Sequence, residues 1–139
     1  MERILSPLVS RQQKRFDCIP GGSSRHRSIR EALTFIEESR RRISPEAPAL
    51  PDMVIVHDGA RPIIDGDTLH QLVSNCEQWG AAGVVCRLTS TILSAKAVNP
   101  QLLTMGTALD RGKYWASETP QAFRYALLVE AYNKVRASS

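Results

Sequence analysis

The sequence lacks a long hydrophobic run. None of its 139 residues lies in an apolar segment that approaches the roughly 18 residues a membrane-spanning helix needs, and the stretch from Met1 to Pro7 has no apolar core of signal-peptide length. Cysteine is also scarce: Cys18, Cys76 and Cys86 are widely spaced, odd in number and without a CxxC pair. This usage argues against a disulfide framework and against a structural zinc site. We therefore expect a cytosolic (cytoplasmic) protein with reduced thiols and no membrane partner.

Internal repeats, low-complexity tracts and the common glycine-rich phosphate motifs are also missing. The chain contains neither a GxGxxG sequence nor a P-loop with its lysine. Its hydrophobic content of 42% and charged content of 23% are ordinary for a globular protein, which excludes disordered and collagen-like chains. A chain of 139 residues fits one domain. We expect a poorly ordered or helical end at 1–15 and a single domain at 16–139.

Positive charge is concentrated in the first part of the chain. The net charge is +4, and residues 1–42 alone hold ten Lys and Arg against five Asp and Glu. Such an excess favours an anionic partner, either a nucleic acid or a phosphorylated small molecule, unless it only solvates a helix surface. The basic stretch 25–42 lacks an aromatic platform on which bases could stack, so we expect no nucleic-acid partner.

Hydrophobic periodicity predicts strands that alternate with helices. Residues 87–118 alternate only weakly, and we expect them to form an extended excursion. The order of elements predicts a parallel α/β sheet with right-handed crossovers, in which ligands bind at loops beyond the carboxyl ends of the strands. The expected strands lie at 16–19, 53–56 and 82–86, and the expected helices at 28–42, 66–80 and 123–135.

The loop PGGSSRHRS, between the first strand and the first helix, is the first of three candidate ligand loops. Gly21 and Gly22 would let the backbone approach a ligand closely, because glycine has no Cβ. Ser28 can cap the helix or bind a ribose hydroxyl, and Arg25 or Arg27 can pair with phosphate. A purely structural turn is the alternative, since many strand–helix turns are rich in Gly and Ser.

The second candidate loop, HDGARP, directly follows the strand at 53–56. Asp58 could hold a substrate hydroxyl or a metal-bound water there, while Arg61 orients it or contacts an anion. The alternative is an ion pair between Asp58 and Arg61 that only shapes the turn. His57 has no partner at metal-ligand spacing, so we expect it to be packed or hydrogen-bonded.

The third candidate loop is ETPQAF, which the periodicity places at the start of the last helix. Thr119 before Pro120 is an ordinary arrangement at a helix start. The hydroxyl of Thr119 and the amide of Gln121 could also contact a ligand at this position.

Together and in this order, the three loops resemble one family. The chain is similar to the cytidylyltransferases of the methylerythritol-phosphate cytidylyltransferase type, a family that includes an animal ribitol-5-phosphate branch. The likeness covers about residues 16–133, and RHRSI, STILSA and ASETPQAF are closer to the animal branch than to bacterial enzymes. The matching segments are GGSSRHRSI (21–29), VIVHDGARP (54–62), AAGVV (81–85), LDR (109–111) and ETPQAF (118–123).

The resemblance implies an α/β fold with an incomplete three-layer, Rossmann-like parallel sheet of the nucleotide-diphospho-sugar transferase type and a protruding β-arm. Residues 87–118 would form that arm, clasp a second subunit and lend residues to its active site. We therefore expect a homodimer in which apolar arm positions such as Ile92, Leu102 and Leu103 are covered by the partner chain. A disordered surface loop at 87–118 is the alternative.

The resemblance also implies a nucleotidyl transfer. CTP and an alditol phosphate (ribitol 5-phosphate) would give a CDP-alditol (CDP-ribitol) and pyrophosphate, with Mg²⁺ as the cofactor that accompanies CTP. The alternative acceptor is 2-C-methylerythritol 4-phosphate. No covalent enzyme intermediate is needed, so catalysis would consist of charge neutralisation and in-line positioning, for which arginine is suited.

Matches to the family motifs also assign the site residues. Arg111 would position the acceptor phosphate for attack, with Thr119 beside it, and Asp58, Arg61 and Arg111 would carry catalysis. No residue is assigned as a metal ligand. The residues that match the nucleotide pocket are Gly21, Gly22, Ser23, Arg25, Ser28 and Gly59. Those that match the acceptor side are Asp58, Arg61, Thr91, Arg111 and Thr119.

Two segments of the family pattern have no counterpart in the sequence. A basic, Gly-rich loop of the AAGxGxRM…PKQ kind, which grips the triphosphate, matches nothing in residues 1–20, and a KVT-like lysine segment is missing after the last helix. The sequence therefore resembles the middle of such an enzyme, with 16–139 as a partial cytidylyltransferase domain that we expect to be inactive alone. The alternative function is a non-catalytic remnant or isoform that dimerises or weakly binds nucleotide.

Overall fold

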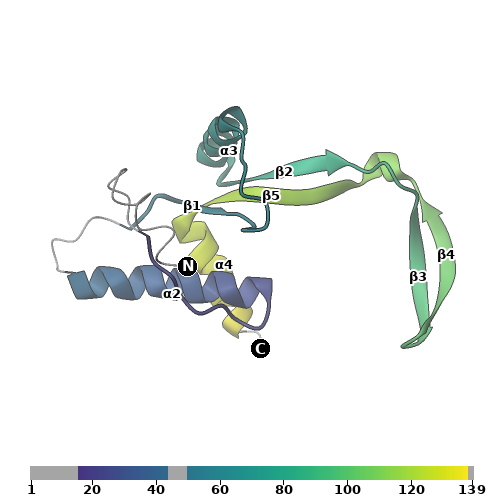
Figure 1. Ribbon diagram of the computed structural model, residues 1–139, viewed down its shortest axis with the longest axis horizontal. Coiled ribbons are helices and arrows are strands. Elements are labelled where there is room, and N and C mark those ends of the chain that lie inside the picture. The colour runs from purple at the N-terminus through teal and green to yellow at the C-terminus, as the bar shows by residue number, and fades with distance from the viewer. Residues whose placement is uncertain (1–15, 44–49, 138–139) are drawn as a thin grey trace. The chain divides into compact units, whose positions relative to one another are not determined.

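The computed structural model describes residues 16–43 and 50–137, and the chain divides into two units, Met1–Leu50 and Pro51–Ser139 (Figure 1). Each unit is described by itself. The expectation for residues 1–15 lies outside the described residues. Among the described residues, no helix combines the length and the apolar character needed to cross a bilayer.

The described part of the first unit is an irregular segment followed by one helix. Helix α2 spans Arg25–Ile43, and the strand predicted at 16–19 is wrong because no described strand pairs with these residues. The helix begins before the predicted Ser28, since the amide of Ser28 already donates to the carbonyl of Ser24 at 2.9 Å. Ser28 therefore lies inside the first turn, and its predicted role as the helix cap is wrong.

The second unit is built on a three-stranded sheet in the order β1-β5-β2. Strands β1 and β2 run in the same direction, as the predicted crossover through helix α3 requires, but β5 lies between them and pairs antiparallel with both. The predicted all-parallel pairing is therefore wrong for the described strands, although the mixed α/β class is confirmed. The elements of the sheet are β1 (Met53–Val56), α3 (Gly66–Trp79), β2 (Ala81–Arg87) and β5 (Trp115–Arg124), followed by helix α4 (Tyr125–Ala137).

Strand β5 contains the ETPQAF segment that the sequence placed at the start of the last helix. Helix α4 begins only at Tyr125, so the interpretation of Thr119 and Pro120 as a helix start is wrong. Proline is rare in central strands because it has no N–H for the ladder, and it is tolerated mainly at bulges. Pro120 lies where the pairing of β5 with β2 shifts register, which explains how the strand accommodates it. The same proline made the segment resemble a helix start in the sequence.

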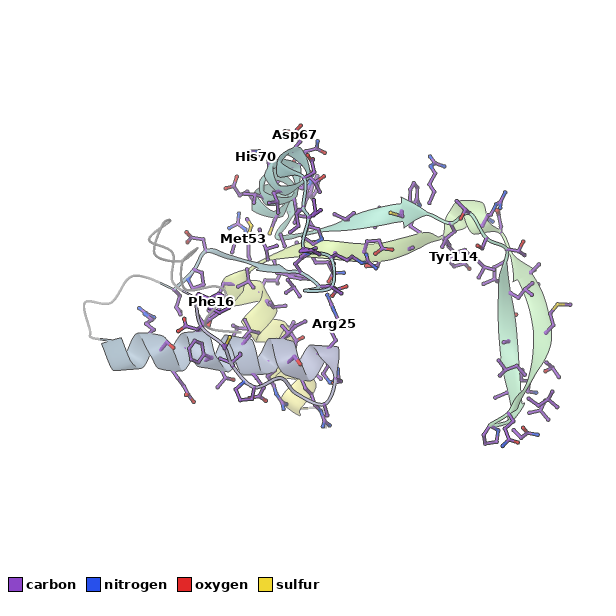
Figure 2. All side chains as sticks on the ribbon, viewed as in Figure 1. Phe16, Arg25, Met53, Asp67, His70 and Tyr114 are labelled. Carbon is purple, nitrogen blue, oxygen red and sulfur yellow. The ribbon has the colours of Figure 1, made fainter. Side chains whose placement is uncertain are left out.

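The core of the second unit forms where α3 packs on the sheet. Leu72 and Cys76 of α3 lie buried against Ala122 of β5, with Met53 (labelled in Figure 2) and Ala82 packed beside them. Ala122 is fully buried, and its small side chain leaves room for the helix to lie close to the central strand. Burial raises the pKa of the Cys76 thiol, so the group stays protonated and packs as a small apolar side chain.

The predicted excursion is a two-stranded hairpin that stands apart from the main sheet. Strands β3 (Ile92–Asn99) and β4 (Leu102–Leu109) pair only with each other, and the 3₁₀ helix η1 (Arg111–Lys113) leads back into β5. Figure 1 shows this hairpin, here called the arm, projecting from the end of β2 and β5. Leu102 and Leu103 are exposed on it, whereas Ile92 is half-buried. An isolated two-stranded sheet is marginally stable.

Helix α3 begins and ends where the sequence predicts. The carboxylate of Asp65 accepts from the amide of Thr68 at 2.9 Å, which satisfies a free N–H of the first turn. Gly80 ends the helix with φ of 85° and donates its amide to the carbonyl of Cys76 at 2.8 Å. Side chains disfavour this left-handed conformation, so glycine is required at position 80.

We predict that Gly80→Ala destabilises the protein by roughly 1–2 kcal/mol, because alanine must adopt the left-handed conformation. Gly66→Ala is the matched control, since a Cβ at Gly66 meets nothing within 4 Å and its φ is ordinary. Urea unfolding of both variants checks the difference. Equal stability of the two variants would contradict the left-handed cap.

Candidate active site

Two of the predicted loops meet at one edge of the second unit. The β1–β5 register pairs Val56 with Gln121, and continuing this register two positions beyond the end of β1 places Asp58 opposite Thr119. The amide of Asp58 donates to the Thr119 hydroxyl at 3.4 Å, although the two residues are 61 positions apart in the chain. The HDGARP turn and the ETPQAF segment therefore form one site.

A bulge in β5 presents the second half of this site. Between the pairs Gly83–Gln121 and Val85–Ser117, β2 advances two residues while β5 advances four. The additional residues of β5 therefore lie within 118–120. Bulges redirect side chains and are common beside functional sites. This one provides Glu118, whose carboxylate forms an ion pair with the guanidinium of Arg61.

Arg61 is held at its backbone as well as at its side chain. Its amide donates to the carbonyl of Asp58 at 3.0 Å, which closes the turn. The ring of His57 is bonded through Nε2 to the carbonyl of Arg61 at 2.5 Å, and because a carbonyl only accepts, Nε2 carries the proton. The hydrogen-bonded role expected of His57 is confirmed, and the turn has a defined shape.

The electrostatics of Arg61 are set mainly by Glu118. The hydrogen bond and the charge of Glu118 raise the pKa of Arg61, and the charge of Asp58 raises it slightly further. The guanidinium therefore stays a cation at any physiological pH. The ion pair that the sequence suggested as an alternative, between Asp58 and Arg61, is replaced by the pair with Glu118.

Glu118 is the site residue that sequence reasoning missed. It directly precedes the Thr-Pro-Gln triplet, but nothing in its local pattern connects it with Arg61, 57 positions earlier. Only the β1–β5 pairing, together with the bulge, brings the two side chains together. An antiparallel assignment of β5 would have been the signal needed to find it.

The arm residues Arg111 and Thr91 lie elsewhere in the second unit. Arg111 is in η1 and donates from Nη1 to the carbonyl of Thr89 at 2.6 Å, while Asp110 caps η1 through the amide of Gly112. Thr91 is exposed just before β3. Tyr114, which follows η1, marks this base of the arm in Figure 2.

The glycine loop of the first unit is fastened to helix α2 by one hydroxyl. Ser28 Oγ accepts from the amide of Gly22 at 3.0 Å and lies within hydrogen-bond reach of the carbonyls of Gly22 and Ser24. A Cβ on Gly22 would lie 2.5 Å from Cβ of Arg27, which no real structure tolerates. Arg27 in turn donates to the Ser23 hydroxyl at 2.8 Å. Local packing therefore explains Gly22 and Ser28, and exposed Arg25 lies at the start of the helix.

Gly59, in the HDGARP turn, behaves differently. A Cβ at this position would meet nothing within 4 Å, and the backbone does not adopt a left-handed φ. Neither the packing nor the conformation of this chain requires glycine at position 59.

These loops are the motifs of a known family. The family described as "IspD: 2-C-methyl-D-erythritol 4-phosphate cytidylyltransferase" matches residues 2–139. The chain belongs to this family.

Curated relatives of this IspD-family chain fall in two groups. It is 36% identical over 135 residues to the D-ribitol-5-phosphate cytidylyltransferase of Rattus norvegicus, covering 96% of this chain and 28% of that protein. It is 34% identical over 116 residues to the 2-C-methyl-D-erythritol 4-phosphate cytidylyltransferase of Geobacillus kaustophilus, covering 84% of this chain and 43% of that protein. The chain thus spans less than half of the length of either relative.

Solved structures agree with the fold. The 2-C-methyl-D-erythritol 4-phosphate cytidylyltransferase of Thermus thermophilus aligns with a TM-score of 0.63 at 26% identity, over 86% of this chain and 50% of that one. The 4-diphosphocytidyl-2C-methyl-D-erythritol synthase of Anaerococcus prevotii aligns with a TM-score of 0.68 at 20% identity, over 98% of this chain and 55% of that one. The described elements are therefore part of a cytidylyltransferase fold.

The geometry of the glycine loop predicts that Gly22→Ala disturbs it. The added methyl must displace the backbone of Arg27 and Ser28, so we expect a loss of roughly 1–3 kcal/mol and faster amide exchange at the loop. Gly59→Ala serves as the control, expected within about 0.5 kcal/mol of wild type. Thermal unfolding and hydrogen exchange measure both effects. A Gly22→Ala variant with wild-type exchange would contradict the packing described here.

Proposed function

We propose that the protein transfers the cytidylyl group of CTP to an alditol phosphate, with ribitol 5-phosphate as the acceptor, and releases pyrophosphate. The observation that carries this proposal is the meeting of the HDGARP turn and ETPQAF at the β1–β5 edge of an IspD-family chain. The ribitol-phosphate acceptor is supported by the relative from Rattus norvegicus, whose match extends over 96% of this chain.

In this reaction a phosphate oxygen of the acceptor attacks the α-phosphorus of CTP, and the bond to the pyrophosphate leaving group breaks. The protein's work is to position the two phosphates in line and to neutralise their charge. In the proposal, the glycine loop of the first unit binds the nucleotide. Asp58, Arg61 and Thr119 hold the acceptor, and Arg111 with Thr91 receives the acceptor phosphate.

Mg²⁺ is part of the proposal as a companion of CTP. Among residues 16–43 and 50–137, no three His, Cys, Asp or Glu side chains are grouped so that they could hold a metal ion. Mg²⁺ commonly keeps several waters and binds through substrate phosphates and one or two carboxylates. The described residues are compatible with such a nucleotide-held ion, for which Asp58 is the carboxylate that the turn offers. Bound Mg²⁺ would neutralise charge on the triphosphate.

A homodimer in the cytosol completes the proposal. The arm projects from the end of β2 and β5 (Figure 1), and its exposed apolar side chains have no cover from their own unit. A second subunit could cover these side chains and receive Arg111 and Thr91 at its own Asp58 turn. The large exposed apolar residues of the arm are Leu93, Val98, Leu102, Leu103 and Met105.

In the full-length protein, we predict that Arg111→Ala lowers the transfer rate by at least tenfold while leaving CTP affinity within about twofold. The proposed role of Arg111 is to orient the acceptor phosphate, whereas the glycine loop binds the nucleotide. Calorimetry with CTP and steady-state kinetics with ribitol 5-phosphate measure the two effects separately. A loss of CTP affinity with unchanged acceptor kinetics would reverse the assignment.

The proposed dimer leads to a second prediction. Asp58→Ala and Arg111→Ala proteins should each be inactive, but mixing them should restore activity if each site combines the turn of one chain with the arm of the other. With random exchange, half of the dimers are mixed and each has one intact site, so about a quarter of all sites should recover. Subunit exchange is verified with differently tagged chains. Proven exchange without recovery would place Arg111 in the site of its own chain.

A further inference from the structure

The turn site carries a net negative charge. Asp58, Arg61 and Glu118 together have a formal charge of −1, and the Arg61–Glu118 ion pair neutralises the only cation among them. Glu118 is half-buried, whereas its partner Arg61 is exposed, so solvent reaches the pair from the arginine side. An anion gains little at such a site. A neutral polyol gains more, because its hydroxyls donate to carboxylates and accept from a guanidinium.

The base of the arm, at η1, carries a net positive charge. The described contact of the Arg111 guanidinium is a neutral carbonyl, that of Thr89, rather than a carboxylate. The carboxylate of Asp110 is used by the amide of Gly112, and Lys113 adds another positive charge in η1. Arg111, Lys113 and Asp110 thus have a formal charge of +1. An alditol phosphate has an uncharged polyol chain, which suits the negative turn, and an anionic end, which suits the positive base of the arm.

We propose that Glu118 is a specificity-determining residue: by pairing with Arg61, it makes the 58–61 turn a receptor for hydroxyl groups of the acceptor chain instead of its phosphate. This inference rests on the proposed function, which supplies the acceptor. Arg61 has five N–H donors, and Glu118 accepts from one of them, so the others can still donate to hydroxyl oxygens of the acceptor. The Thr119 hydroxyl, next in the chain, lies at the same turn.

The test uses the full chain and two simple probes, ribitol and inorganic phosphate. Binding of each probe is detected by NMR as a shift of the side-chain nitrogen signals of Arg61. In the wild-type protein, ribitol should shift the Arg61 signal and phosphate should not at the same concentration. Glu118→Gln removes one negative charge, so phosphate should bind at Arg61 roughly fourfold tighter than in wild type. The same change should weaken ribitol binding roughly threefold, because a charged acceptor is lost.

Two further variants separate specificity from folding. Glu118→Asp retains the charge and should keep the preference for ribitol. Glu130→Gln is the matched control, since Glu130 forms an exposed ion pair with Lys134 in helix α4, away from the turn; it should behave as wild type. Phosphate binding at Arg61 of the wild-type protein, or no response to ribitol, would overturn the proposal even if Glu118→Gln failed to fold.

Turnover is measured separately with CTP, Mg²⁺ and ribitol 5-phosphate. Absence of CDP-ribitol from the wild-type full-length protein would refute the proposed function, whereas the Arg61 signal reports the charge preference of the turn without turnover. In an active protein, Glu118→Gln should raise the KM for ribitol 5-phosphate more than it lowers kcat. An unchanged KM would refute the role of Glu118 alone.

Discussion

The antiparallel pairing of β5 with β1 is the constraint on which the site depends. This register places Asp58 opposite Thr119, and a one-residue slip would turn every side chain of the strand to the other face. The same strand carries Ala122 into the core below α3, so packing and site geometry are fixed by one register. Changes in the core that move β5 would therefore also move Thr119.

The bulge in β5 frees residues 118–120 from the strand ladder. A regular central strand would hold Glu118, Thr119 and Pro120 in the ladder, where proline cannot donate. The extra residues of β5, which lie between the pairs of Gly83 and Val85, release this segment from regular pairing with β2, and Glu118 reaches Arg61. The sheet beyond the bulge continues to Trp115, over whose ring Arg87 lies at 4.9 Å. The strand thus connects the turn site with the base of the arm.

Charge is divided between these two places in a way that composition does not reveal. The overall charge of +4, which arises from the excess within residues 1–42, says nothing about how charge is distributed within the second unit. Within the second unit, the turn is negative and neutralises its arginine, while η1 is positive and leaves Arg111 on a neutral carbonyl. The two arginines that we propose for the acceptor side therefore have different chemical environments, which supports different roles for them.

The sequence by itself determined the features that depend on neighbouring residues. The caps of α3 at Asp65 and Gly80 and the strand at 53–56 were predictable, because capping and β-branched runs act over a few positions. The family motifs also indicated the α/β class. The tertiary structure alone decided the antiparallel place of β5, the strand state of ETPQAF and the pairing of Arg61 with Glu118. These three features depend on contacts between residues about sixty positions apart, and local periodicity carries no information about such contacts.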